Sequence, residues 1–126
     1  MNANVIPRLA LVLSLMACAQ SGTAQNSAST RAARAEGERA YLRVGCHACH
    51  GTVGHGGAGP KLAPNTLPLA AFEAWVRRGT PGWTITSGMP AFPADLLSDD
   101  ELADVRAFLA GLPEPKPPEQ IPLLRD

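Results

Sequence analysis

The sequence Cys46-His47-Ala48-Cys49-His50 constrains this chain more than any other feature. Two cysteines separated by two residues, with a histidine directly after the second, form the attachment pattern of a c-type haem. Each thiol can add across one haem vinyl group, and His50 then lies beside the porphyrin, where it can bind iron. The motif therefore predicts one covalently bound haem c, anchored by Cys46 and Cys49, with His50 as an iron ligand.

Paired cysteines at this spacing also occur in redox dithiols and in zinc sites. A thioredoxin-like dithiol needs a preceding strand and a surrounding βαβ unit, and neither pattern is visible around Cys46. A structural zinc site normally uses four ligands. Outside the motif the remaining candidates are Cys18, in an N-terminal apolar run, and His55. Haem attachment is the favoured interpretation.

The N-terminal residues 1–19 have the composition of a secretory signal. A basic residue precedes residues 9–17, an apolar run that is short for a membrane span. Ala17-Cys18-Ala19 offers small residues for cleavage, and the same place resembles a bacterial lipobox. We therefore expect an exported, periplasmic protein, with a lipid anchor at Cys18 as the alternative processing route.

The rest of the chain divides into three parts. Residues 20–30 are rich in Ser, Ala, Thr and Gln, a composition typical of a flexible linker. Residues 31–112 carry the haem motif and form the predicted haem domain, and residues 113–126 form a Pro-rich tail. The whole chain has 11 basic and 11 acidic residues. This balance argues against a nucleic-acid binder.

Apolar residues at helical spacing, without a strand pattern, predict an all-α fold. The first helix is expected over residues 31–44, with Thr30 as its cap. Gly37 in its middle costs roughly 1 kcal/mol relative to alanine. Close approach of another helix backbone would be a reason for that glycine.

Two further helices follow the haem motif. The second is predicted from Pro68 to Gly79, and the third from Ser98 to Gly111. Ser98 and Glu101 have the spacing of a capping box. The expected apolar stripes are Leu69, Phe72, Trp75 and Val76 in the second helix, and Leu102, Val105, Phe108 and Leu109 in the third.

The second iron ligand separates two classes of function. Haem iron with one protein ligand can bind gases or peroxide, whereas two strong ligands suit electron transfer. Once the signal is removed, Met89 is the only methionine left, between Gly88 and Pro90 in an irregular stretch. We predict Met89 as the second ligand. The alternatives are His55 as the ligand and Met89 as an ordinary core residue.

The CxxCH motif, the later Gly-Met-Pro and the capped last helix make residues 31–112 resemble the class I (mitochondrial-type) bacterial monohaem cytochromes c. This resemblance implies a small cytochrome c fold, with three main helices around one haem. Its first and last helices cross. At that crossing Gly37 and Tyr41 would face Phe108 or Leu109.

The resemblance also implies that the Pro60 carbonyl accepts a hydrogen bond from Nδ1 of His50, which leaves Nε2 for iron. Ordinary loop punctuation is the alternative role of Pro60. The stretch from His50 to Met89 is shorter than in the mitochondrial members, which would expose more of the haem edge. Within it, Trp83 is either a donor to a haem propionate or only a wall of the pocket.

These expectations favour an electron-transfer protein of the periplasm that is not an enzyme. One haem c iron would cycle between Fe(III) and Fe(II), in a diffusible carrier or in the cytochrome subunit of a periplasmic dehydrogenase. That dehydrogenase would be the donor, and an oxidase or another cytochrome the acceptor. The alternative is a haem enzyme or a gas or redox sensor with an open sixth iron site. The residues expected to line a water-excluding pocket are Leu62, Phe72, Trp75, Phe92 and Leu102.

Overall fold

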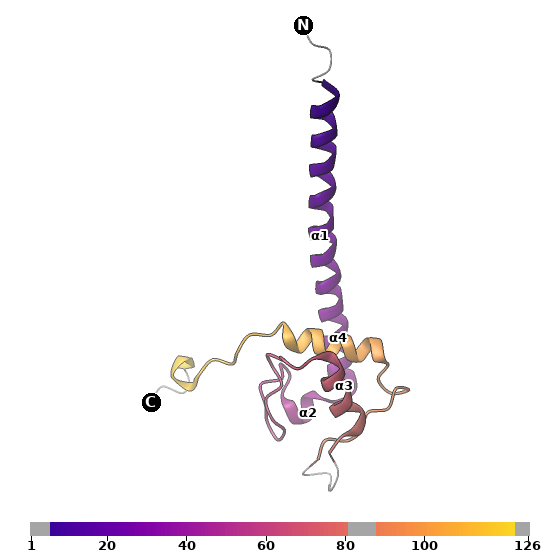
Figure 1. Ribbon diagram of the computed structural model, residues 1–126. Helices are drawn as coiled ribbons and strands as arrows, with labels where there is room; N and C mark the ends of the chain where they lie inside the picture. Colours follow the sequence, from indigo (N-terminus) through magenta and orange to yellow (C-terminus); the bar gives the residue numbers. More distant parts are fainter. Residues whose placement is uncertain (1–5, 81–87, 123–126) are drawn as a thin grey trace. The chain divides into compact units, whose positions relative to one another are not determined.

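The computed structural model describes the backbone of residues 6–80 and 88–122, and the side chains of residues 24–80 and 88–122. Over these residues the chain is helical and has no strand, so the predicted all-α fold is confirmed (Figure 1). The elements are α1 (Ile6–Arg43), α2 (His47–His50), α3 (Leu69–Arg78), α4 (Asp99–Ala110) and the short 3-10 helix η1 (Pro118–Gln120).

The chain divides into two compact units, Met1–Ala32 and Ala33–Asp126, and α1 contributes residues to both. The second unit contains the haem motif and the helices that follow it. Among the described residues, no helix has both the length and the apolar character needed to span a bilayer. The expected signal at residues 1–19 and the domain limits at residues 31 and 112 stay predictions.

The first helix begins earlier than the sequence pattern indicated. Residues 20–30, expected to be a flexible linker, are helical, and α1 continues through Thr30. The prediction that Thr30 caps the helix is wrong, because its hydroxyl donates to the Asn26 carbonyl at 2.9 Å, as a threonine inside a helix does. Residues 8–43 contain no proline that would end the helix.

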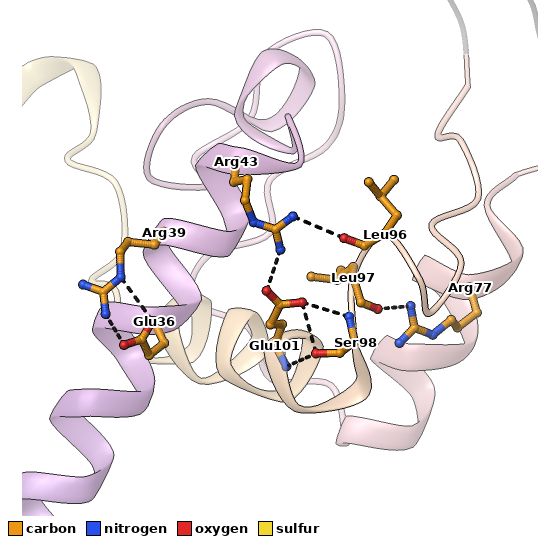
Figure 2. A network of polar contacts seen from close by, with 8 residues as sticks. All are labelled: Glu36, Arg39, Arg43, Arg77, Leu96, Leu97, Ser98 and Glu101. Atoms are coloured by element: carbon orange, nitrogen blue, oxygen red, sulfur yellow. Dashed lines mark hydrogen bonds and ion pairs between the residues drawn. The ribbon is translucent and has the colours of Figure 1, made fainter.

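The predicted second and third helices are confirmed. Pro68 and Gly79 flank α3, and Ser98 caps α4. The Ser98 hydroxyl accepts from the Glu101 amide at 3.3 Å, and the Ser98 amide donates to the Glu101 carboxylate at 2.9 Å. Arg43, at the end of α1, donates to the same carboxylate at 2.6 Å (Figure 2). The capping box therefore also joins α4 to α1.

α4 crosses the last turns of α1 at the buried residue Gly37. A Cβ atom on Gly37 would fall on the carbonyl group of Asp104 and lie 2.8 Å from the Val105 nitrogen. One turn further along α1, the ring of Tyr41 packs on Phe108 with the centroids 5.6 Å apart. The expected contact between Tyr41 and Phe108 is confirmed. At Gly37 the nearest atoms belong to the backbone of α4, as expected for a glycine at a close helix approach.

The core lies between the end of α1, α3 and α4. Phe72 and Val76 are its residues from α3, whereas Leu69 and Trp75 are 41% and 49% exposed. Of the four residues of the predicted apolar stripe, Phe72 and Val76 are therefore the two that are buried in the core. Phe72 and Val76 lie one turn apart, and Trp75 is rotated away from them. The Arg78 guanidinium covers the Trp75 ring instead, 5.1 Å from its centroid.

Within the Pro-rich C-terminal tail, residues 118–120 form η1. Pro117 directly precedes η1, and Pro118 lies in its first turn, where a proline is tolerated. The start of the tail is tied to the loop after the haem motif. Lys61 and Glu114 form an ion pair of 2.6 Å, and His55 Nε2 lies 3.2 Å from the Pro113 carbonyl oxygen.

Replacement of Gly37 by alanine should destabilise the folded protein. Helix propensity alone would favour the alanine by about 1 kcal/mol. Steric overlap with the Asp104 carbonyl should reverse that sign and lower the free energy of unfolding by about 1–3 kcal/mol or more. Urea unfolding followed by circular dichroism measures the change. Glu38→Ala, one residue along the same helix at an exposed position, is the control and should not destabilise.

Candidate haem site

The haem motif forms a single helical turn. Cys46 precedes α2 with helical backbone angles, and the His50 amide donates to the Cys46 carbonyl at 3.1 Å. Residues three apart on a helix lie on the same side, so the turn presents Cys46 and Cys49 to one neighbour. Both cysteines are free, with Cys46 half-buried and Cys49 exposed. One planar group with two reactive positions can therefore meet both thiols.

The thiol of Cys46 does not have the character of a redox nucleophile. Burial raises the pKa of the Cys46 thiol to about 11, although a backbone hydrogen bond lowers it in part, and Cys49 adds a smaller increase. Catalytic dithiols work in the opposite way, through a lowered pKa that generates the thiolate. The environment of Cys46 therefore argues against a thioredoxin-like site, the first alternative for this motif.

His50 is buried, with 6% of its surface exposed, and its Nδ1 lies 2.8 Å from the carbonyl oxygen of Pro60. A carbonyl can only accept, so Nδ1 carries the proton in this contact. In the tautomer with the proton on Nδ1, the lone pair is on Nε2. A backbone acceptor that fixes the tautomer and orientation of an imidazole is the usual support of a metal-binding histidine.

The loop after the motif folds back over α2. The Gly56 amide donates to the His50 carbonyl at 2.9 Å, and the Gly59 amide donates to the Cys49 carbonyl at 2.7 Å. A Cβ atom on Gly59 would lie 2.7 Å from Cε1 of His50 and 2.8 Å from its Nδ1. Only glycine leaves room for the imidazole ring at this point of the loop.

Tyr41 supports the same turn from α1. Its hydroxyl donates to the carbonyl of Gly51, the residue after His50, at 2.7 Å. Burial, with a smaller contribution from Cys46, raises the pKa of Tyr41 to about 12. The hydroxyl therefore stays protonated and remains a donor over the whole physiological range.

Met89 lies on a segment packed against the end of α3. Its side chain is half-buried and contacts the edge of the core. The Thr80 amide donates to the Met89 carbonyl at 3.1 Å, and the Met89 amide donates to the Thr80 hydroxyl at 3.1 Å. Further along, the Phe92 amide donates to the Val76 carbonyl at 3.0 Å.

Arg77 joins this segment to the start of α4. One guanidinium nitrogen donates to the carbonyl oxygens of Phe92 at 2.8 Å and Leu97 at 2.7 Å, and Figure 2 shows the bond to Leu97. The other nitrogen contacts Asp99 at 2.5 Å. A planar fork of donors suits such simultaneous contacts.

The predicted site residues therefore fall into two groups. Cys46, Cys49, His50 and Pro60 form one cluster, and Met89 lies on the segment beside α3. His55, the alternative iron ligand, uses its Nε2 in the contact with the Pro113 carbonyl. Trp83 lies outside the described residues, and so does the Cys18 side chain.

The residues predicted to line the pocket differ in how far they are buried. Phe72, Phe92 and Leu102 are buried in the core, and Leu62 is half-buried against it. Trp75 is 49% exposed, and its place in the pocket stays a prediction. Sequence reasoning missed Thr80 and Arg77, because no local pattern signals a bond between residues 9 positions apart or more.

Comparison with known proteins gives a family match and one curated relative. Residues 32–109 match the family described as "Cytochrome C oxidase, cbb3-type, subunit III". The chain is 37% identical over 79 residues to the "4-cresol dehydrogenase (hydroxylating) cytochrome c subunit" of Pseudomonas putida. That match covers 63% of this chain and 62% of the relative's length. No solved structure shows significant similarity.

The residues present fit the cofactor of such a family. Covalent haem attachment needs two thiols and an iron ligand. The chain has two free thiols on one side of a helical turn and an imidazole with an available Nε2. The family match contains all of these groups and extends over more than half of the chain. The cofactor is therefore covalently bound haem c. The chain is a c-type cytochrome and belongs to the family described as "Cytochrome C oxidase, cbb3-type, subunit III".

Proposed function

We propose that this protein is a class I monohaem electron carrier in which Cys46 and Cys49 form the thioether bonds and His50 and Met89 are the iron ligands. The observation that carries the proposal is the 2.8 Å contact between His50 Nδ1 and the Pro60 carbonyl. This contact leaves Nε2 as a fixed donor. Two permanent ligands make a carrier, because they leave no open iron position for a substrate or a gas.

The residues of the chain set the conditions for electron transfer. When bound, haem c supplies an iron that changes between Fe(III) and Fe(II) by one electron. Pro60 keeps His50 in one orientation, and the Met89 thioether favours the reduced state and raises the potential. Buried Phe72 and Phe92 exclude water from the core and act in the same direction.

For the partner, the proposal is a dehydrogenase that supplies electrons, with an oxidase or another cytochrome as acceptor. The relative from Pseudomonas putida is named as the cytochrome c subunit of a dehydrogenase. The site of action would be the periplasm, reached through a signal at residues 1–19. Cys18 is the candidate for a lipid anchor, and Trp83 the candidate for a propionate contact or pocket wall.

Purification of the native protein from its own host should recover a dehydrogenase subunit in stoichiometric amount. The expectation follows from the likeness to a dehydrogenase cytochrome subunit. Size-exclusion chromatography of the periplasmic fraction, read by haem absorbance, measures it. A protein that elutes only as a monomer would contradict the subunit role and leave the diffusible carrier.

Met89→Ala should remove the second iron ligand. The oxidised wild-type protein should show the weak far-red band of methionine bound to ferric haem, and the variant should lack it. The reduced wild type should resist carbon monoxide, whereas the variant should bind it readily. Absorption spectra of both proteins decide the matter. A wild type that binds carbon monoxide as readily as Met89→Ala would favour the haem enzyme or gas sensor.

Gly59→Ala should displace the His50 ring, because the added Cβ would overlap Cε1 and Nδ1. We expect a loss of about 1–3 kcal/mol in the free energy of unfolding and a lower proportion of haem-loaded protein. The neighbouring exposed residue provides the control Ala58→Ser, which should match the wild type. Denaturant unfolding and the ratio of haem to protein absorbance measure the two effects. If Gly59→Ala and Ala58→Ser had the same free energy of unfolding and the same ratio of haem to protein absorbance, the support for His50 as a positioned ligand would be lost.

A further inference from the structure

We propose that Thr80 is a positioning residue for Met89 and determines how firmly that methionine holds the iron. The inference rests on the proposed role of Met89 as iron ligand. Thr80 directly follows the glycine that ends α3 and lies 9 positions before Met89. It touches the backbone of Met89 and would act on the metal only through it.

The two residues form a reciprocal pair of hydrogen bonds. The Thr80 amide donates to the Met89 carbonyl, and the Thr80 hydroxyl accepts from the Met89 amide, each at 3.1 Å. Both polar groups of the Met89 main chain are therefore bound to one residue. Such a pair restrains the direction of the peptide as well as its distance from α3.

The neighbouring backbone confirms how close the two segments are. Gly79 has φ +63, and a Cβ atom on it would lie 2.6 Å from the Met89 carbonyl oxygen and 2.8 Å from the Ala91 nitrogen. Further along, Val76 and Arg77 hold Phe92. Those bonds fix the segment three residues beyond the ligand, whereas Thr80 fixes Met89 itself.

The backbone restraint matters because methionine is a flexible ligand. Its unbranched side chain has three rotatable bonds, so the sulfur has no fixed place unless the Cα atom has one. Without the Thr80 hydroxyl, the half-buried Met89 amide loses its acceptor. A lost hydrogen bond of this kind weakens the conformation that depends on it. The thioether would then compete less well with an added ligand.

The test is a titration of the oxidised, haem-loaded full-length protein with imidazole, followed by loss of the far-red band. Thr80→Val keeps the shape and removes the hydroxyl acceptor. We expect imidazole to bind about threefold to tenfold more tightly to it, the factor that corresponds to one hydrogen bond. Thr80→Ser should restore the wild-type affinity. Thr66→Val is the matched control at an exposed loop position and should behave as the wild type.

The outcomes separate this inference from the proposed function. Unchanged imidazole affinity in Thr80→Val, together with a far-red band that Met89→Ala abolishes, would overturn the role of Thr80 and leave the carrier intact. A far-red band that survives in Met89→Ala would overturn the proposed ligand and this inference with it. If Thr80→Val fails to take up haem, the same titration of Thr80→Ala decides between these outcomes.

Discussion

The close approach of α1 and α4 at Gly37 is the contact on which the haem site depends. Because Gly37 has no side chain, the backbones of the two helices can touch there. Tyr41 lies one turn further along α1 and packs against Phe108. From there the Tyr41 hydroxyl reaches the Gly51 carbonyl, directly after His50. The crossing of α1 with α4, a helix that comes much later in the chain than the motif, therefore supports the turn that carries the proposed iron ligand.

The two proposed iron ligands are held by different parts of the same unit. His50 lies on a single helical turn between α1 and the glycine loop, whose amides return to α2. Met89 lies in an irregular segment, and the end of α3 supports it through Thr80. Each ligand thus has its own scaffold. Disturbance of one scaffold need not loosen the other.

Features that depend on residues close together in the chain could be predicted from the sequence. CxxCH, the Ser98–Glu101 capping box and the limits of α3 are read from residues a few positions apart, and the structure has the capping box and these helix limits. The start of α1 could not be predicted, because the mixture of Ser, Ala, Thr and Gln in residues 20–30 is compatible with both a helix and a linker. Nor did the apolar stripe of α3 show which of its residues are buried, since Phe72 and Val76 pack in the core while Trp75 is 49% exposed.

Of the contacts across the chain, the mid-helix glycine Gly37 alone indicated a close helix approach, and the family resemblance supplied the partners of His50 and Tyr41. Spacing alone left Pro60 as loop punctuation, and the resemblance paired it with His50, which the structure also brings together. Nothing comparable pointed to Thr80 or Arg77. Their partners are carbonyls and amides, which every residue possesses, so no residue type in the sequence marks them.

That dependence on peptide groups has an evolutionary consequence. His50, Tyr41 and Arg77 all donate to backbone carbonyls in the haem domain. An acceptor of this kind survives any substitution that preserves the path of the main chain. The accepting positions can therefore change identity while the donors stay fixed. A domain built in this way can diverge widely in sequence and still keep its cofactor in the same setting.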